Sequence, residues 1–146
     1  GKREYMEKVA PAGPVYQAGT LSANPVAMCA GLATLEQLED GSVYRQLETL
    51  GARLEAGLSG AGGFTLQRQG SVFWPLLATT TTPVRSLAAL RAVNAAPFGP
   101  VFHRLLDRGI YLAPSAFEVG FLSAAHTTAH VDQLVSELKD AIADLR

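Results

Sequence analysis

Residues 64–77 read Phe-Thr-Leu-Gln-Arg-Gln-Gly-Ser-Val-Phe-Trp-Pro-Leu-Leu, and they decide the fold class. Two runs of strand-forming character, Phe64–Arg68 and Val72–Leu77, flank Gly70-Ser71, a pair that is typical of a tight turn. The pattern therefore predicts two antiparallel strands joined as a hairpin. Pro75 has no backbone N–H to donate, so it favours an edge strand or a bulge in the second run.

Upstream of this hairpin the sequence predicts two helices. Asn24-Pro25 is a strong helix start, which predicts a helix over 25–38, and Asp40-Gly41 should end it. A second helix follows and ends at the glycines 60, 62 and 63. Its apolar side chains recur at three- and four-residue steps along one face: Tyr44, Leu47, Leu50, Leu54 and Leu58.

Downstream of the hairpin, residues 79–82 are four threonines that read as a loop ahead of the next helix. That helix should start near Ser86 and end before Pro97. Another amphipathic helix follows, and Gly109 is placed to close it. Its apolar residues are Phe98, Val101, Phe102, Leu105 and Leu106.

The last part of the chain predicts two short strands, 110–113 and 120–124, and a final helix that opens near Thr127 or Thr128. One face of this helix is apolar: Val131, Leu134, Val135, Leu138, Ile142 and Leu145. The order of elements indicates an α+β fold, an antiparallel sheet covered by helices, rather than a doubly wound sheet. No strand is followed by a dinucleotide-binding glycine motif.

Composition narrows the class of protein. The chain has 146 residues, of which 48% are hydrophobic and 17% are charged, enough apolar material for a compact fold. Its net charge of −1 and the scatter of its basic residues argue against nucleic acid as a partner. The apolar runs fall short of the roughly 20 residues that span a bilayer, and the start has no secretory signal pattern. With Cys29 as the one cysteine, a reducing, cytoplasmic location is expected.

The loop from Gly13 to Pro25 is the first candidate for chemistry. Its glycines and the hydroxyls of Thr20 and Ser22 lead directly into the predicted helix start at Asn24. Free amides at a helix N-terminus attract phosphate, and a Thr hydroxyl adds a donor. The same residue types also cap helices and fill turns, so spacing alone leaves a plain capped loop as the alternative.

Two longer strings make the assignment more specific. Residues 13–28, Gly-Pro-Val-Tyr-Gln-Ala-Gly-Thr-Leu-Ser-Ala-Asn-Pro-Val-Ala-Met, resemble the glutamate-1-semialdehyde 2,1-aminomutase family of class-III aminotransferases. Residues 109–126, Gly-Ile-Tyr-Leu-Ala-Pro-Ser-Ala-Phe-Glu-Val-Gly-Phe-Leu-Ser-Ala-Ala-His, look like the C-terminal signature of that family. The resemblance departs at Ala23, where the family usually has Gly, and at Val119, where it usually has Ala.

This resemblance implies a fold and a domain organisation. Family members are homodimeric, pyridoxal 5'-phosphate-dependent fold type I enzymes of tetrapyrrole synthesis. Residues 1–40 would end the large domain, with the cofactor-phosphate loop and a connecting helix, and residues 41–146 would form the small C-terminal domain. The rest of the large domain, which is N-terminal to these residues and carries the Schiff-base lysine, would lie outside this chain. None of Lys2, Lys8 and Lys139 matches that lysine, so the chain alone is expected to be inactive.

The resemblance also implies roles for three residues. Gly19 and Thr20 would contact the phosphate of the cofactor that the second subunit holds. Glu118 would face the active site, where related aminotransferases place an arginine for a substrate carboxylate. A carboxylate there repels a second carboxylate and suits a small amino-aldehyde substrate.

Other polar residues receive structural interpretations. His126 and His130 are four apart, as some metal ligands are, but no third ligand is near them in sequence, so no metal is expected. Cys29 sits among apolar neighbours, which predicts a small buried side chain. His103 reads as a polar-face residue, and Tyr16 as an interface residue.

Two other functions stay open on the sequence. One is another class-III aminotransferase, for which an arginine would be expected in place of Glu118. The other is a non-catalytic dimerisation module that keeps the small-domain fold without the chemistry.

Overall fold

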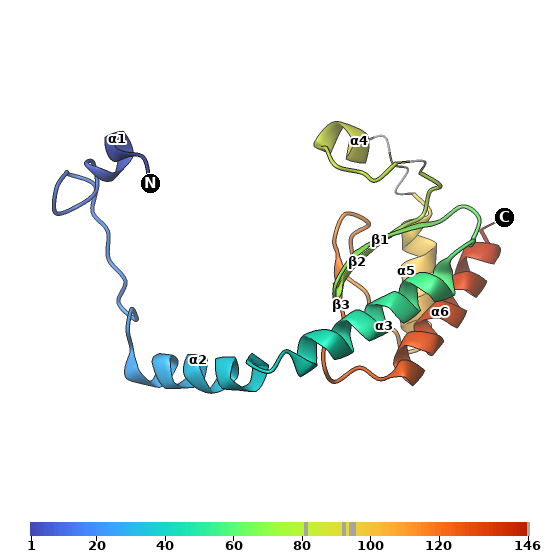
Figure 1. Ribbon diagram of the computed structural model, residues 1–146. Helices are drawn as coiled ribbons and strands as arrows, with labels where there is room; N and C mark the ends of the chain where they lie inside the picture. Colours follow the sequence, from blue (N-terminus) through green and yellow to red (C-terminus); the bar gives the residue numbers. More distant parts are fainter. Residues whose placement is uncertain (81, 92, 94–95, 146) are drawn as a thin grey trace. The chain divides into compact units, whose positions relative to one another are not determined.

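The computed structural model describes residues 1–80, 82–91, 93 and 96–145. It divides into two compact units, Gly1–Asp40 (unit 1) and Gly41–Arg146 (unit 2), and each is described by itself. Figure 1 labels the helices and strands of both units. None of the helices that the structure describes is long and apolar enough to cross a membrane.

Unit 1 holds two helices, α1 (Arg3–Met6) and α2 (Pro25–Leu38). The bounds predicted for α2 are confirmed, and their cause is visible at its start. The side chain of Asn24 accepts hydrogen bonds from the amides of Val26 (3.0 Å) and Ala27 (3.2 Å). No residue of either helix is buried within this chain. The single turn of α1 was not predicted.

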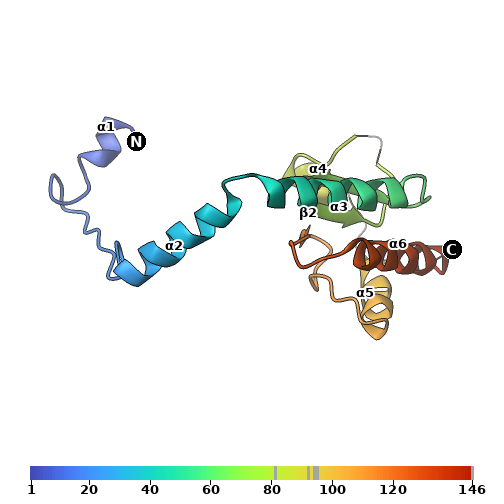
Figure 2. The same ribbon diagram turned by 60° about the horizontal axis from the view of Figure 1, so that its bottom comes forward.

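Unit 2 has its core between helices and a small sheet. Its helices are α3 (Ser42–Leu58), α4 (Leu87–Arg91), α5 (Phe98–Asp107) and α6 (Thr128–Ala143). Helices α3 and α6 lie side by side, and α5 packs against α6 (Figures 1 and 2). Most of the predicted apolar faces are buried in one cluster. Its most buried side chains are Leu54, Leu105, Val131 and Leu138.

Gly109 ends α5 as predicted. Its φ of 77° lies in the left-handed region that favours glycine. The amide of Gly109 donates to Leu106 O (2.9 Å), and the amide of Ile110 donates to Leu105 O (2.9 Å). This pair of bonds is the Schellman arrangement, which satisfies the last carbonyls of a helix.

The sheet has three antiparallel strands in the order β1-β2-β3. The strands are β1 (Thr65–Gln69), β2 (Val72–Leu76) and β3 (Gly120–Phe121). The predicted hairpin is confirmed, with Gln69 paired to Val72 around the turn. The expectation of an edge strand at Pro75 was wrong for the strand as a whole, because β2 is the middle strand. However, β3 pairs only with Val72 and Phe73, so at Pro75 strand β2 has β1 as its one partner.

Three other expectations were wrong in part. Residues 110–113 are not a strand, because they pair with no described strand. Ile110 and Leu112 nevertheless pack against the core. The strand expected over 120–124 is only two residues long. The helix expected from Ser86 shortens to α4, and residues 92, 94 and 95 lie outside the described residues, as does residue 81 of the threonine loop.

Ion pairs connect α3 to its neighbours. Arg53 on α3 donates to both carboxylate oxygens of Asp132 on α6 (2.5 and 2.8 Å). Arg68 on β1 donates to Glu48 (2.9 Å) and Glu55 (3.0 Å) on α3. The hydrogen bonds from Arg53 and Arg68 lower the pKa values of Asp132 and Glu48, respectively.

The pairing of Asp132 predicts a specific acid sensitivity. A carboxyl group whose pKa is lower in the folded state than in the unfolded state stabilises the fold above its unfolded pKa, and this stabilisation is lost as the pH falls through the folded pKa. Unit 2 should therefore lose stability below about pH 4, near the pKa of an unfolded Asp. In Arg53→Gln the free energy of unfolding should decrease less steeply as the pH falls, because the pKa of Asp132 is then no longer lowered.

Urea unfolding followed by tryptophan fluorescence between pH 7 and pH 3 measures this effect. Arg45→Gln is the control, since it removes an arginine from the same helix and leaves Asp132 paired. Identical pH profiles for Arg53→Gln and the unchanged chain would contradict the assignment. Because both partners are about half exposed, added salt should reduce the effect.

Candidate functional site

The three candidate residues lie in two units. Gly19 and Thr20 are neighbours in the loop of unit 1 that precedes α2. Glu118 lies in unit 2, in the segment between α5 and β3. The surroundings of each residue are therefore described within its own unit.

The base of the unit 1 loop is held by backbone contacts. The amide of Val15 donates to Lys8 O (2.9 Å), and the amide of Ala10 donates to Val15 O (2.8 Å). Gly13 packs so closely on the backbone of Glu7 and Lys8 that a side chain there would overlap it. The segment before Tyr16 is thus fixed locally, and the residues after it project from a defined base.

The loop around Thr20 leaves donors free. The amide of Ser22 donates to Gly19 O (3.0 Å), which closes a tight turn. The hydroxyl of Ser22 lies against the Cα of Gly19, so a side chain at that position would collide with it. Within the described residues, the amides of Gly19, Thr20 and Leu21 and the hydroxyl of Thr20 have no hydrogen-bond partner. Thr20 is also exposed, so these donors are available to an anion.

The expectation that the first turn of α2 offers free amides was wrong. Asn24 Oδ1 already accepts from Val26 and Ala27, and the amide of Met28 donates to Asn24 O (2.9 Å). An anion at this loop would therefore meet the amides of the Gly19 turn and not those of the capped helix.

Ala23 has an unusual backbone between the turn and the helix. Its φ is 57°, and it is the only described residue other than glycine with a positive φ. An alanine side chain is disfavoured in this left-handed conformation by about 1 kcal/mol relative to glycine. The departure from Gly noted in the sequence thus falls at the position where the loop geometry favours Gly.

Glu118 is presented by a short turn. The hydroxyl of Ser115 accepts from the amide of Phe117 (3.2 Å), and Ser115 O accepts from the amide of Glu118 (3.2 Å). Ser115 thus has a structural role, because both of its bonds shape this turn. Glu118 is exposed and borders a small recess in unit 2. Apolar side chains line that recess: Phe73, Pro75, Phe98 and Leu112.

Sequence reasoning missed Trp74, which ties this turn to the sheet. Its indole Nε1–H donates to Ala116 O (2.9 Å), 42 residues further along the chain. The signal in the sequence was that a half-buried Trp needs a partner for its N–H. The acceptor for the indole N–H is set by tertiary structure, so residue spacing in the sequence does not predict it.

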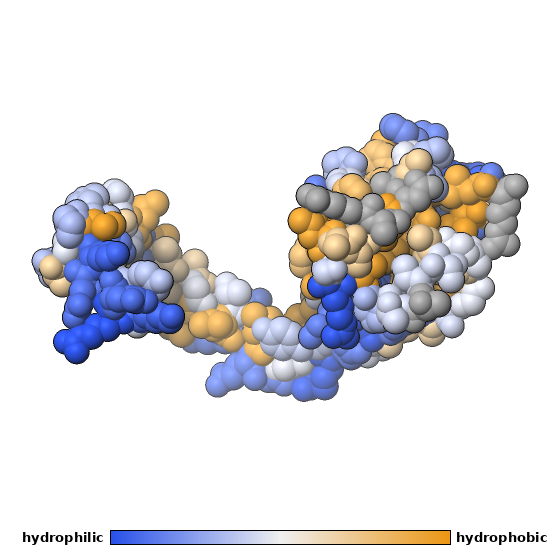
Figure 3. Space-filling model, turned by 90° about the horizontal axis from the view of Figure 1, so that it is seen from above, coloured by the Kyte–Doolittle hydropathy of each residue, from blue (hydrophilic) through white to orange (hydrophobic). Residues whose placement is uncertain are grey.

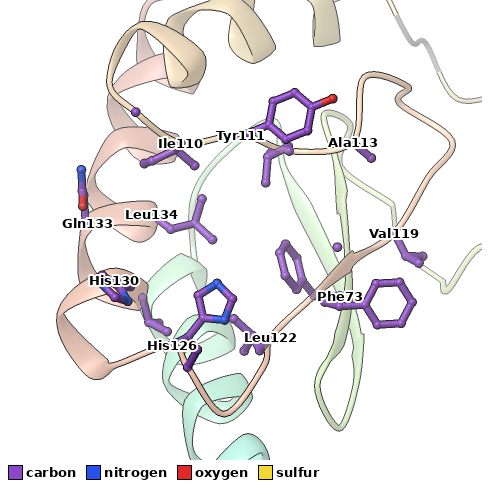
Figure 4. A pocket seen from close by; sticks show the side chains of 16 residues that line it. Phe73, Ile110, Tyr111, Ala113, Val119, Leu122, His126, His130, Gln133 and Leu134 are labelled. Carbon is purple, nitrogen blue, oxygen red and sulfur yellow. The ribbon is translucent and has the colours of Figure 1, made fainter.

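A larger hollow of about 580 Å³ lies between α6 and the segments 109–113 and 119–122. Figure 4 shows His126 directed into it. His126 Nδ1 accepts from the amide of Ser123 (2.9 Å), and His130 Nδ1 accepts from the amide of Thr127 (3.2 Å). Both rings therefore fix the start of α6. In the part of the chain that the structure describes, no cluster of side chains could hold a metal ion.

The remaining candidates are surface residues of this chain. Tyr16 is 84% exposed, and His103 is exposed on α5. Cys29 is exposed too, so its predicted burial was wrong, because nothing in unit 1 covers α2. The hydropathy colouring of Figure 3 shows both apolar and polar residues on the surface of the chain.

Comparison with known proteins gives one consistent result. No protein-family profile matches the chain. The chain is 51% identical over 148 residues to a glutamate-1-semialdehyde 2,1-aminomutase of Thermus thermophilus, covering 97% of this chain and 34% of that protein. It is 46% identical over 150 residues to the enzyme of the same name from Desulfitobacterium hafniense, covering 99% of this chain and 34% of that protein. The chain thus spans about a third of the length of these relatives.

Solved structures of aminotransferases and of an aminomutase also resemble this chain. A β-phenylalanine aminotransferase from Variovorax paradoxus matches with a TM-score of 0.72 at 29% identity, covering 99% of this chain and 34% of that one. A variant glutamate-1-semialdehyde aminomutase from Pseudomonas aeruginosa, in complex with PMP, matches with a TM-score of 0.76 at 25% identity, covering 88% of this chain and 29% of that one.

Fold and sequence together place the chain among the class-III aminotransferases, which are pyridoxal-phosphate-dependent enzymes. It has the α+β fold of their C-terminal domain, as the sequence predicted. Within that class, the chain corresponds to the C-terminal third of the glutamate-1-semialdehyde 2,1-aminomutases.

Proposed function

We propose that this chain is the C-terminal part of an enzyme that converts glutamate 1-semialdehyde to 5-aminolevulinate in tetrapyrrole synthesis. The observation that carries the proposal is the 51% identity to the Thermus aminomutase, which extends over 97% of the chain. The enzyme would act in the cytoplasm as a homodimer. The chain alone would not turn over substrate.

The unit 1 loop would hold the cofactor phosphate. The free amides of Gly19, Thr20 and Leu21 and the Thr20 hydroxyl are donors that a phosphate group accepts from, and they fit this role. The loop would act on the cofactor bound by the second subunit. When bound, pyridoxal 5'-phosphate supplies the electron-withdrawing ring that makes chemistry on amino groups accessible.

Glu118 would set the substrate preference. Its carboxylate, held by the Ser115 turn, would repel a substrate that directs a carboxylate end towards it, such as the C1 carboxylate of glutamate. An aldehyde or an amine at that end would meet no such repulsion. This preference would separate an aminomutase from an aminotransferase that binds a dicarboxylic amino acid.

The lysine that binds the cofactor covalently would come from the part of the enzyme outside this chain. Unit 1 supports this division of roles, because its apolar residues lie open in this chain. Val26 is 77%, Met28 61% and Leu35 66% exposed. A helix of 14 residues is marginal in water by itself, so α2 would need the rest of the enzyme as a packing partner.

Cofactor retention tests the role of the loop. We consider a chimera in which this chain replaces the C-terminal third of the Thermus aminomutase. Thr20→Val in the chimera should weaken retention of pyridoxal 5'-phosphate by about 1 to 2 kcal/mol, or roughly 5- to 30-fold, through one lost hydrogen bond to a charged group. Dialysis, followed by absorbance of the retained cofactor, measures this.

Thr49→Val, on the surface of α3, is the control and should leave retention unchanged. Equal retention by Thr20→Val and Thr49→Val would remove Thr20 from the site. For the chain without its partner domain, borohydride treatment with the cofactor should label no single lysine. One stoichiometrically modified lysine, located by mass spectrometry, would contradict the proposed division of roles.

A further inference from the structure

The hydrogen bond from Trp74 to Ala116 joins two parts of unit 2 that lie far apart in sequence. Trp74 lies in β2, where register pairs it with Gln67 on β1. Its neighbour Phe73 belongs to the helix-covered core, and successive strand residues point to opposite faces. The indole therefore lies on the other face of the sheet, where it meets Ala116 O at 2.9 Å.

The turn that the indole holds is otherwise closed by short-range bonds. These bonds join Ser115 to Phe117 and to Glu118, at 3.2 Å each. Bonds of this kind shape a turn but do not fix it to the rest of a domain. Among the described residues, Trp74 makes the one hydrogen bond that connects residues 114–118 to the sheet. The sheet thus holds the Glu118 backbone from both sides, through this bond before it and through the pairing of Gly120 with Phe73 after it.

We propose that Trp74 is a positioning residue for Glu118. The indole N–H attaches the turn of residues 114–118 to β2. That turn then places the Glu118 carboxylate where it can select the substrate. The first half of this statement concerns structure alone, whereas the second half rests on the proposed function. Glu118 has no hydrogen-bonding side-chain partner in the described part of the chain, so its placement depends on its backbone.

Trp74 is the chain's single tryptophan, so a tryptophan analogue can test this proposal without altering any other residue. Biosynthetic replacement of tryptophan by benzothienylalanine changes position 74 only. This analogue keeps the size and shape of the side chain and replaces the N–H donor with sulfur. It therefore removes the hydrogen bond without creating a cavity.

Hydrogen exchange on the 146-residue chain, measured by NMR, tests whether the indole N–H holds the turn of residues 114–118. The indole N–H of the unchanged chain should exchange at least about 10-fold more slowly than free indole. The benzothienylalanine chain should exchange the amides of Phe117 and Glu118 at least about 5-fold faster, with the amide of Leu54 in the core unchanged. An indole proton that exchanges like free indole would overturn the proposal, and so would turn amides that do not respond. Uniform acceleration of all amides would overturn it as well, since it would show a general loss of stability.

The chimera tests whether Trp74 affects substrate selection through Glu118. Trp74→Phe should lower the preference for glutamate 1-semialdehyde over glutamate at least about 5-fold, while kcat for the preferred substrate changes less than about 2-fold. A combined Trp74→Phe and Glu118→Gln variant should be no less selective than Glu118→Gln alone, because the indole acts through the carboxylate. Additive losses would overturn the positioning role. If the chimera lacks activity altogether, the proposed function fails, whereas the exchange experiment still decides the role of Trp74 in the structure.

Discussion

Gly51→Ala should lower the free energy of unfolding of unit 2 by about 1 to 3 kcal/mol. Gly51 is buried on α3 where the β1–β2 hairpin crosses the helix. A Cβ at this position would lie 2.5 Å from Gly70 O and 2.9 Å from Arg68 Nη1. The first of these is a backbone atom and cannot rotate away. The added methyl group would force the hairpin turn off the helix.

The loss would occur even though alanine is the better helix former by about 1 kcal/mol. Displacement of Arg68 adds to it, because this side chain is only 12% exposed and donates to Gly70 O (2.9 Å) as well as to Glu48 and Glu55. Urea unfolding followed by the fluorescence of Trp74 measures the change. Gly99→Ala is the matched control, since a Cβ at Gly99 on α5 would meet no atom of the described residues within 4 Å beyond its own helix backbone and chain neighbours. Equal stability of the two variants would show that the close approach at Gly51 is not a constraint.

Glu118→Gln in the chimera should reduce the selectivity between glutamate 1-semialdehyde and glutamate by about 10- to 100-fold, which corresponds to roughly 1.4 to 2.8 kcal/mol of lost repulsion. This range is ordinary for two charges a few ångströms apart at a protein site. The change should arise mainly from better use of glutamate, because C1 of glutamate is a carboxylate, whereas C1 of the preferred substrate is an uncharged aldehyde that the Glu118 carboxylate does not repel.

Steady-state kcat/KM values for the two substrates measure this selectivity. Asp107→Asn is the control, since it neutralises an exposed acid at the end of α5. Unchanged selectivity in Glu118→Gln would remove Glu118 from substrate selection. Equal effects of both variants would indicate a general effect of net charge.

Local signals in the sequence were sufficient for the four longest helices that the structure describes. Capping residues, glycines and apolar periodicity predicted α2, α3, α5 and α6, because each of these helices depends on residues close together in sequence. Residues 110–113 show where such signals end. Their alternation is real, since Ile110 and Leu112 do pack inward, but alternation reports burial and not the presence of a partner strand.

The candidate site was less accessible to sequence reasoning. The hydroxyl of Thr20 and the capped helix start follow from residue types, whereas the free amides of the Gly19 turn depend on backbone geometry. Glu118 was found through family resemblance, because an acid in a turn carries no signal of its own. The bond from Trp74 to Ala116 spans 42 residues and arises only when the sheet and the turn are folded together.

Turnover by the chimera tests the central claim most directly. This chain should supply everything that the C-terminal third of an aminomutase supplies: the loop around Thr20 and the turn that carries Glu118. Formation of 5-aminolevulinate from glutamate 1-semialdehyde should proceed with a kcat/KM within about 10-fold of the intact Thermus enzyme, and the chain alone should form none. A folded chimera that retains its cofactor and forms no 5-aminolevulinate would contradict the account.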